Sequence, residues 1–112
     1  MTITWHRRGN IADGKTRQAW AWAMEVTAHS KSVTGVDTGV GIQVGGNPTA
    51  IGFSAQFESL AALEASNGKL LADAKYHEPV ERGADLFIQG TGHDQIGRQI
   101  WRRFERARRL RP

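Results

Sequence analysis

Two alternating runs of apolar residues, at 36–44 and 49–57, constrain the fold of this chain more than any other feature. In each run every second residue is apolar or threonine, while the residues between them are small or polar. Alternation with a period of two is typical of a strand that buries one face. The intervening Gly45-Gly-Asn-Pro48 is a turn sequence. The pattern therefore predicts a β-hairpin with one apolar face and one glycine-rich, polar face.

Patterns in the rest of the sequence predict further strands and helices around this hairpin. Alternation favours strands at 2–8 and 84–89, whereas apolar residues at intervals of three and four favour helices. The helices are expected at 13–32, 59–76 and 94–110, with Ser59 as N-cap of the second. The order is βαββαβ plus a C-terminal helix, which is an α+β, ferredoxin-like arrangement with a four-stranded antiparallel sheet. Right-handed crossovers place the first two helices on the apolar face of the sheet.

Length and composition limit the class of protein. A chain of 112 residues predicts one domain that spans 1–112. The sequence has no cysteine, which excludes disulfides and thiolate sites. No apolar run approaches the roughly 20 residues of a membrane span, and residues 1–10 lack the apolar stretch of a signal peptide. We therefore expect a cytoplasmic protein that does not associate with a membrane.

Basic residues are concentrated at the C-terminal end. Residues 98–112 hold seven arginines and one acidic residue, whereas the whole chain carries a net charge of only +4, so the remainder is slightly acidic. An Arg-rich segment can bind the phosphates of nucleic acids. The same pattern also suits the solvated face of a surface helix anchored by Ile100, Trp101 and Phe104. The second interpretation is favoured.

Three stretches resemble a known superfamily. They are Gly52-Phe-Ser-Ala-Gln-Phe-Glu-Ser-Leu-Ala-Ala-Leu63, Asn67-Gly-Lys-Leu-Leu-Ala-Asp73 with Tyr76, and Gly83-Ala-Asp-Leu-Phe-Ile88. In order and spacing, over roughly residues 2–90, they are similar to the dimeric α/β-barrel superfamily, which includes the antibiotic-biosynthesis monooxygenases. The resemblance implies a homodimer in which two sheets pack face to face. It also implies a pocket in each subunit, between sheet and helices or inside the barrel.

The polar face of the predicted sheet carries the first group of candidate site residues: His6, Asp37, Gln43, Ser54 and Gln56. A carboxylate beside a histidine fixes its tautomer and raises its basicity. Asp37 and Asp85 are both predicted near His6, and His6 with Asp37 is the candidate catalytic pair. The other three are expected to bind a ligand, because glycines on the same face leave volume beside them.

A second group of candidate ligand-binding residues contains aromatic rings. Trp22 is expected to wall a pocket, Tyr76 and His77 end the second predicted helix, and Phe87 is the aromatic residue predicted on the polar sheet face. Some haem-degrading members of the superfamily bind haem through a histidine near the position of His77. Their remaining site residues, an asparagine on the first strand and a helix tryptophan, find no convincing match here. The histidines also lack metal-ligand spacing, so we expect neither a metal nor a cofactor.

These observations favour a homodimeric protein that binds a small molecule. The resemblance does not imply a reaction, because members of the superfamily differ widely. The activity that we expect, if the chain is an enzyme, is that of a cofactor-independent monooxygenase or isomerase acting on a small aromatic or polyketide-like ligand. The alternative is a non-catalytic structural or binding module. A third interpretation is RNA binding through the Arg-rich C-terminal helix, since the topology and the Gly52-Phe53 run are shared with the RNA-recognition motif. Phe53 falls on the apolar face, however, so nucleic acid is not the expected partner.

Overall fold

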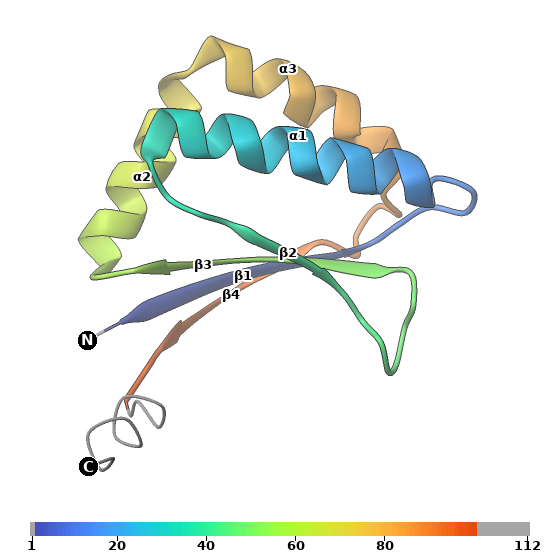
Figure 1. Cartoon of the computed structure of the whole chain (residues 1–112), viewed down its shortest axis with the longest axis horizontal. Coiled ribbons are helices and arrows are strands. Elements are labelled where there is room, and N and C mark those ends of the chain that lie inside the picture. Colours follow the sequence, from blue (N-terminus) through green and yellow to red (C-terminus); the bar gives the residue numbers. More distant parts are fainter. Residues whose placement is uncertain (1, 101–112) are drawn as a thin grey trace, which may run out of the picture.

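The computed structural model describes residues 2–100, which form two layers: a four-stranded sheet and a set of helices that cover one of its faces (Figure 1). The strands are β1 (Ile3–Asn10), β2 (Gly39–Ile42), β3 (Ala50–Phe57) and β4 (His93–Arg98). The helices are α1 (Thr16–Thr34), α2 (Leu60–Ala72) and α3 (Ala74–Arg82), and α3 is followed by the 3-10 turn η1 (Gly83–Leu86).

Neighbouring strands are antiparallel throughout the sheet, in the order β2-β3-β1-β4. This order confirms the predicted ferredoxin-like α+β fold. β1 pairs with β3 on one side and with β4 on the other, so the first strand of the chain is central. Arg7 pairs with Phe53 and Gly9 with Ile51, and these odd-numbered residues of β1 and β3 face the helices.

The fourth strand lies in a different place from the one predicted. Residues 84–89 were expected to form it, but they contain the end of η1 and a single bridge between Ile11 and Phe87. Leu86 and Phe87 both pack against the core, which the alternation of a strand does not allow for consecutive residues. Gly90, with a φ of 81°, then turns the chain, and residues 93–98 pair with the free edge of β1.

The prediction of a C-terminal helix over residues 94–110 is therefore wrong for residues 94–98, which belong to β4. The remainder of that predicted helix, from residue 101, lies outside the described residues.

The second predicted helix is divided into two. Asp73, in an extended conformation, ends α2 and begins α3, and its carboxylate accepts a hydrogen bond from the backbone N–H of Lys75. The predicted N-cap is confirmed, since Ser59 Oγ accepts a hydrogen bond from the N–H of Ala62 at 3.1 Å. A break at Asp73 lets α3 lie against α1 (Figure 1).

The core is centred where α1 crosses the sheet. Ile11, Ala19, Ala23 and Ile51 are buried there, with Trp22, Phe53, Leu86 and Phe87 packed around them. The two alanines bring the backbone of α1 close to the sheet, because they carry almost no side chain to hold it away. No helix within residues 2–100 is long and apolar enough to cross a membrane.

Candidate functional site

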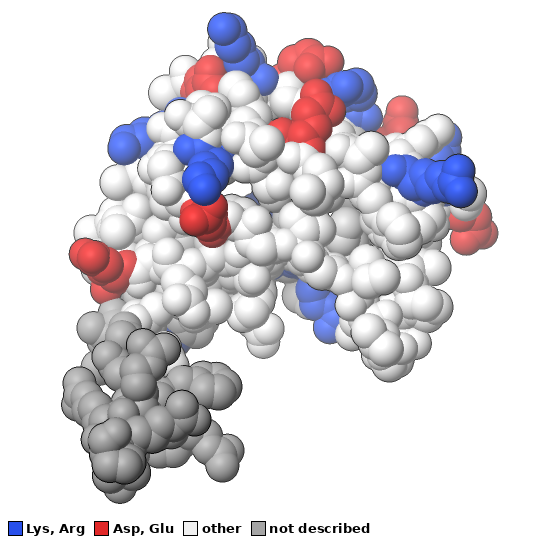
Figure 2. Space-filling model, in the orientation of Figure 1, with Lys and Arg blue, Asp and Glu red and all other residues white. Residues whose placement is uncertain are grey.

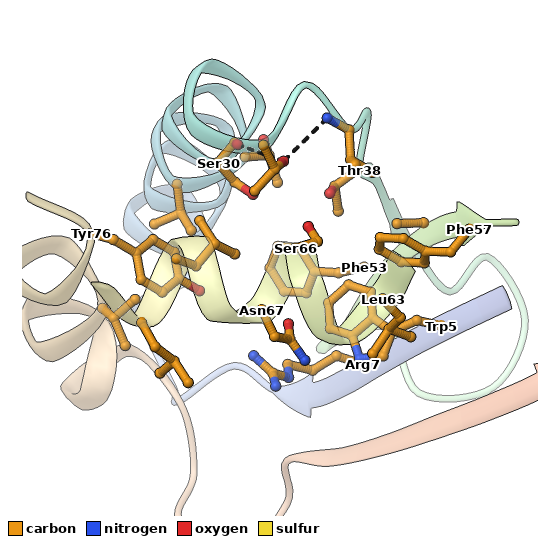
Figure 3. Close-up of a pocket in the computed structure, with 18 of the residues that line it drawn as sticks. Trp5, Arg7, Ser30, Thr38, Phe53, Phe57, Leu63, Ser66, Asn67 and Tyr76 are labelled. Atoms are coloured by element: carbon orange, nitrogen blue, oxygen red, sulfur yellow. Dashed lines mark hydrogen bonds between the residues drawn. The ribbon is translucent and has the colours of Figure 1, made fainter. Parts of the chain in front are cut away.

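A pocket of about 410 Å³ lies between the helices and the sheet (Figure 3). β1 and β3 supply its floor, and α1, α2 and α3 supply its walls. Most of its surface is apolar, and its aromatic side chains are Trp5, Trp22, Phe53, Phe57 and Tyr76. Ala19 and Ala23 seat the N-terminal half of α1 on the sheet, whereas most residues of α1 that line the pocket lie in its C-terminal half: Val26, Thr27, Ser30 and Thr34.

Trp22 is held in the pocket wall by contacts on several sides. Its indole Nε1 donates a hydrogen bond to the backbone oxygen of Pro79 at 2.6 Å. Its ring meets the rings of Phe53 and Phe87 edge-on, with centroid distances of 6.2 and 5.3 Å. Gly83 lies against the ring, and any Cβ at that position would overlap the indole. The wall is therefore rigid, and Phe87 supports it from behind.

Arg7, Trp5 and Asp94 form a polar cluster at the exposed side of the pocket. Arg7 donates from Nε to Oδ1 of Asp94 at 2.7 Å and from Nη2 to Oδ2 at 2.9 Å. The indole of Trp5 donates to the same carboxylate at 3.3 Å, and the guanidinium lies 5.2 Å from the centre of the Trp5 ring. The hydrogen bond from Arg7 lowers the pKa of Asp94 below its usual value, and the same bond raises the pKa of Arg7.

Tyr76 and His77 reach the pocket from the first turn of α3. Tyr76 is half-buried and His77 is exposed. Nε2 of His77 lies 2.7 Å from the backbone oxygen of Leu71. Because a carbonyl oxygen can only accept, Nε2 carries a proton in this bond, and the neutral ring then presents Nδ1 as an acceptor.

The sequence-predicted residues divide into three groups in the structure. Trp22, Tyr76 and His77 line the pocket together, and Phe87 packs behind Trp22. His6 and Gln56 line a second, shallower groove of about 390 Å³ on the opposite face of the sheet, and Ser54 pairs with His6 across β1 and β3.

Asp37 and Gln43 belong to neither group. Asp37 lies before β2, where its carboxylate pairs with Lys31 at 2.6 Å. Gln43 lies after β2, where its side-chain oxygen accepts the N–H of Asn47 inside the hairpin turn. Among residues 2–100 no hydrogen bond or ion pair joins His6 to Asp37. The proposed catalytic pair therefore stays a prediction that these contacts do not support.

Sequence reasoning did not select Arg7, Trp5 or Asp94. A signal for the first two was present, since Arg7 follows Ile3 and Trp5 at intervals of two and so shares their pocket-facing side. Asp94 was hidden because it was assigned to the start of a helix.

Another ion pair ties the helices together away from the pocket. Nε2 of His29 on α1 donates to Oδ2 of Asp73 at 2.7 Å, and both side chains are about three-quarters buried, with exposed fractions of 27% and 22%. This hydrogen bond lowers the pKa of Asp73. Figure 2 shows that most Lys, Arg, Asp and Glu side chains on the visible face lie over the helices. Residues 2–100 contain no cluster of three or more His, Asp or Glu side chains that could hold a metal ion.

Comparisons with known proteins identify the fold. No family model matches the sequence, and no curated protein matches it. Among solved structures, a NIPSNAP-family protein from Agrobacterium tumefaciens is similar, with a TM-score of 0.74 and 18% identity over 88% of this chain and 92% of that one. A NIPSNAP-domain protein from Burkholderia xenovorans has a TM-score of 0.75 and 13% identity over 87% and 93%.

A third similar structure is SnoaB, a cofactor-independent oxygenase from Streptomyces nogalater. Its TM-score is 0.69 and its identity 9%, over 91% of this chain and 96% of that one. The resemblance inferred from the sequence is confirmed at the level of the fold.

Proposed function

We propose that this chain binds a small, partly aromatic organic molecule. It has the ferredoxin-like α+β fold that SnoaB and the NIPSNAP-family proteins share, which supports this proposal. The site is the pocket between the helices and the sheet. The observation that carries the proposal is the pocket itself: about 410 Å³, lined by five aromatic rings and a few polar side chains. Small-molecule sites have this size and this mixture of apolar walls and convergent polar groups.

The shape of the walls favours a planar ligand. Trp22 is fixed by its bond to Pro79 and by the edges of Phe53 and Phe87, so its position is set before a ligand arrives. A preformed wall costs little ordering entropy on binding. Aromatic rings also gain from offset or edge-on contact with a planar guest.

The finer part of the proposal is the reaction, which is either a cofactor-independent isomerisation or a cofactor-independent monooxygenation of that ligand. In the monooxygenation molecular oxygen is the oxidant, a CH2 group of the ligand becomes C=O, and the second oxygen atom leaves as water. SnoaB is a cofactor-independent oxygenase of the same fold, which supports this choice without establishing it, because one fold hosts many activities. His77 is the candidate base, because its hydrogen bond to Leu71 leaves Nδ1 as an acceptor beside the pocket. The alternative is a protein that binds the same ligand without transforming it.

The open face of the sheet supports a second part of the proposal, a homodimer. This face carries His6, Ser54 and Gln56 beside the glycines of β2 and β3, and a Cβ at Gly41 would meet nothing within 4 Å. A second copy of the sheet can approach such a surface closely. RNA stacking is not favoured there, because Phe53 faces the pocket instead.

A matched pair of variants on α2 tests the pocket. Ser66 lines it, whereas Glu64 lies two residues earlier and is exposed outside it. We expect naphthamide, an uncharged bicyclic probe, to raise the melting temperature of the wild-type protein as its concentration rises. Ser66→Trp should fill the pocket and abolish the rise, and Glu64→Trp should keep it. No response in the wild-type protein, or an equal response in both variants, contradicts the proposal.

A further inference from the structure

The charge inside the pocket is one-sided. Among residues 2–100, none of those that line the pocket is acidic, and Arg7 is the only one of them with a permanent charge. The walls are mostly apolar, but the Arg7 side chain is 52% exposed, so solvent screens part of its charge. Arg7 is therefore the group of the lining that could meet a charged group on a ligand.

The guanidinium of Arg7 is held in a fixed position. Asp94 engages Nε and Nη2 in a two-point hydrogen bond, and the ring of Trp5 lies against the guanidinium. Nη1 has no hydrogen-bond partner among residues 2–100. A planar fork that is already oriented loses less entropy when it binds an anion than a free side chain does. Figure 3 shows the Arg7 side chain extending along the pocket from β1.

The partial exposure of this pair matters for what it can bind. Arg7 lines the pocket, and the side chains of Arg7 and Asp94 are 52% and 41% exposed, so part of the guanidinium is open to a ligand while the ion pair stays intact. Asp94 offsets part of the positive charge, which makes the remaining attraction short-ranged. What the pocket offers is then a directed donor, and hydrogen bonds from a charged donor to a charged acceptor are the strong ones.

We propose that the pocket prefers aromatic ligands bearing an anionic oxygen, such as a carboxylate, and that Arg7 binds that oxygen. The inference rests on the proposed small-molecule site and names the class of ligand that the site takes. Asp94 is a positioning residue in this arrangement, since it orients both the guanidinium and the Trp5 indole and does not itself line the pocket.

The test compares naphthoate with naphthamide, which share a ring system and differ in charge at neutral pH. We expect naphthoate to bind the wild-type protein about tenfold more tightly, the ratio that corresponds to ~1.4 kcal/mol from one charge-assisted hydrogen bond. Arg7→Gln should lower naphthoate affinity until it equals the affinity of the same variant for naphthamide, so that the preference disappears. Arg8→Gln is the matched control, because Arg8 follows Arg7 in β1 and so lies on the opposite face of the sheet, and its removal changes the net charge equally.

A measurement on the wild-type protein covers the case in which Arg7→Gln does not fold. The Nε–H resonance of Arg7, followed by NMR, should shift when naphthoate is added and stay in place when naphthamide is added. Equal affinity for the two probes, a preference that survives in Arg7→Gln, or an unmoved resonance overturns the inference alone. Failure of both probes to bind overturns the proposed function along with it.

Discussion

Gly83 lies directly against the indole of Trp22, so that a Cβ on Gly83 would overlap Cε2, Nε1 and Cζ2 of the ring. The indole is also hydrogen-bonded to Pro79, four residues earlier in the chain. The turn after α3 thus packs directly against the pocket wall. Trp22 can take its position because Gly83 has no side chain.

Gly83→Ala should therefore destabilise the protein by about 1–3 kcal/mol, as expected when a methyl group is forced into a filled site. It should also shift the tryptophan fluorescence, because Trp22 must move. Gly68→Ala is the control, because a Cβ at that position meets nothing within 4 Å. An alanine inside α2 should raise the free energy of unfolding by at most about 1 kcal/mol. Chemical denaturation of both variants checks this, and equal stabilities would contradict the packing described.

Two neighbours on β3 should separate stability from binding. Ile51 is buried in the core. Ile51→Ala should lower the free energy of unfolding by about 2–5 kcal/mol, because it removes contacts and leaves a cavity. Phe53 borders the pocket, so part of its ring already faces open space. Phe53→Ala should therefore lower the free energy of unfolding by less than Ile51→Ala does. Naphthamide affinity should fall in Phe53→Ala and persist in Ile51→Ala. The reverse pattern, measured by titration and denaturation, would place the ligand elsewhere.

The pair of His29 and Asp73 predicts a dependence of stability on pH. The pKa of Asp73 is lowered in the folded protein, so its contribution to stability is present above the unfolded value of about 3.9 and is lost as the pH falls through the folded value. Asp73→Asn should therefore flatten the decline of unfolding free energy in acid. Asp13→Asn, which changes an exposed loop carboxylate, is the control, and an identical acid profile for Asp73→Asn and wild type would contradict the prediction.

The oligomeric state tests the proposal that two copies of the chain form a homodimer through the open sheet face. Sedimentation of the wild-type protein should give about twice the 12.4 kDa mass of the chain. Gly41→Arg places a charge on that face and should yield monomers, whereas Gly45→Arg in the hairpin turn should not. A Cβ at either position would meet nothing within 4 Å, so we expect both variants to fold. A wild-type monomer would contradict the proposal.

The candidate site was only partly predictable from the sequence. Trp22, Tyr76 and His77 were selected for their chemistry, and all three line one pocket. His6, Ser54 and Gln56 were placed on one face by alternation, and they lie on the face opposite the pocket. The sequence pointed to both faces and could not decide between them, because a cavity depends on how the helices sit above the sheet.

Local patterns in the sequence determined β1, the β2–β3 hairpin, α1 and the cap at Ser59, because each depends on neighbours within a few residues. Only the tertiary structure decided β4, whose residues are all exposed and carry no apolar stripe. That segment becomes a strand because the edge of β1 offers it unpaired hydrogen-bonding groups. The same pairing brings Asp94 to Arg7, 87 residues away in the chain, and a contact over that distance leaves no periodic trace in the sequence.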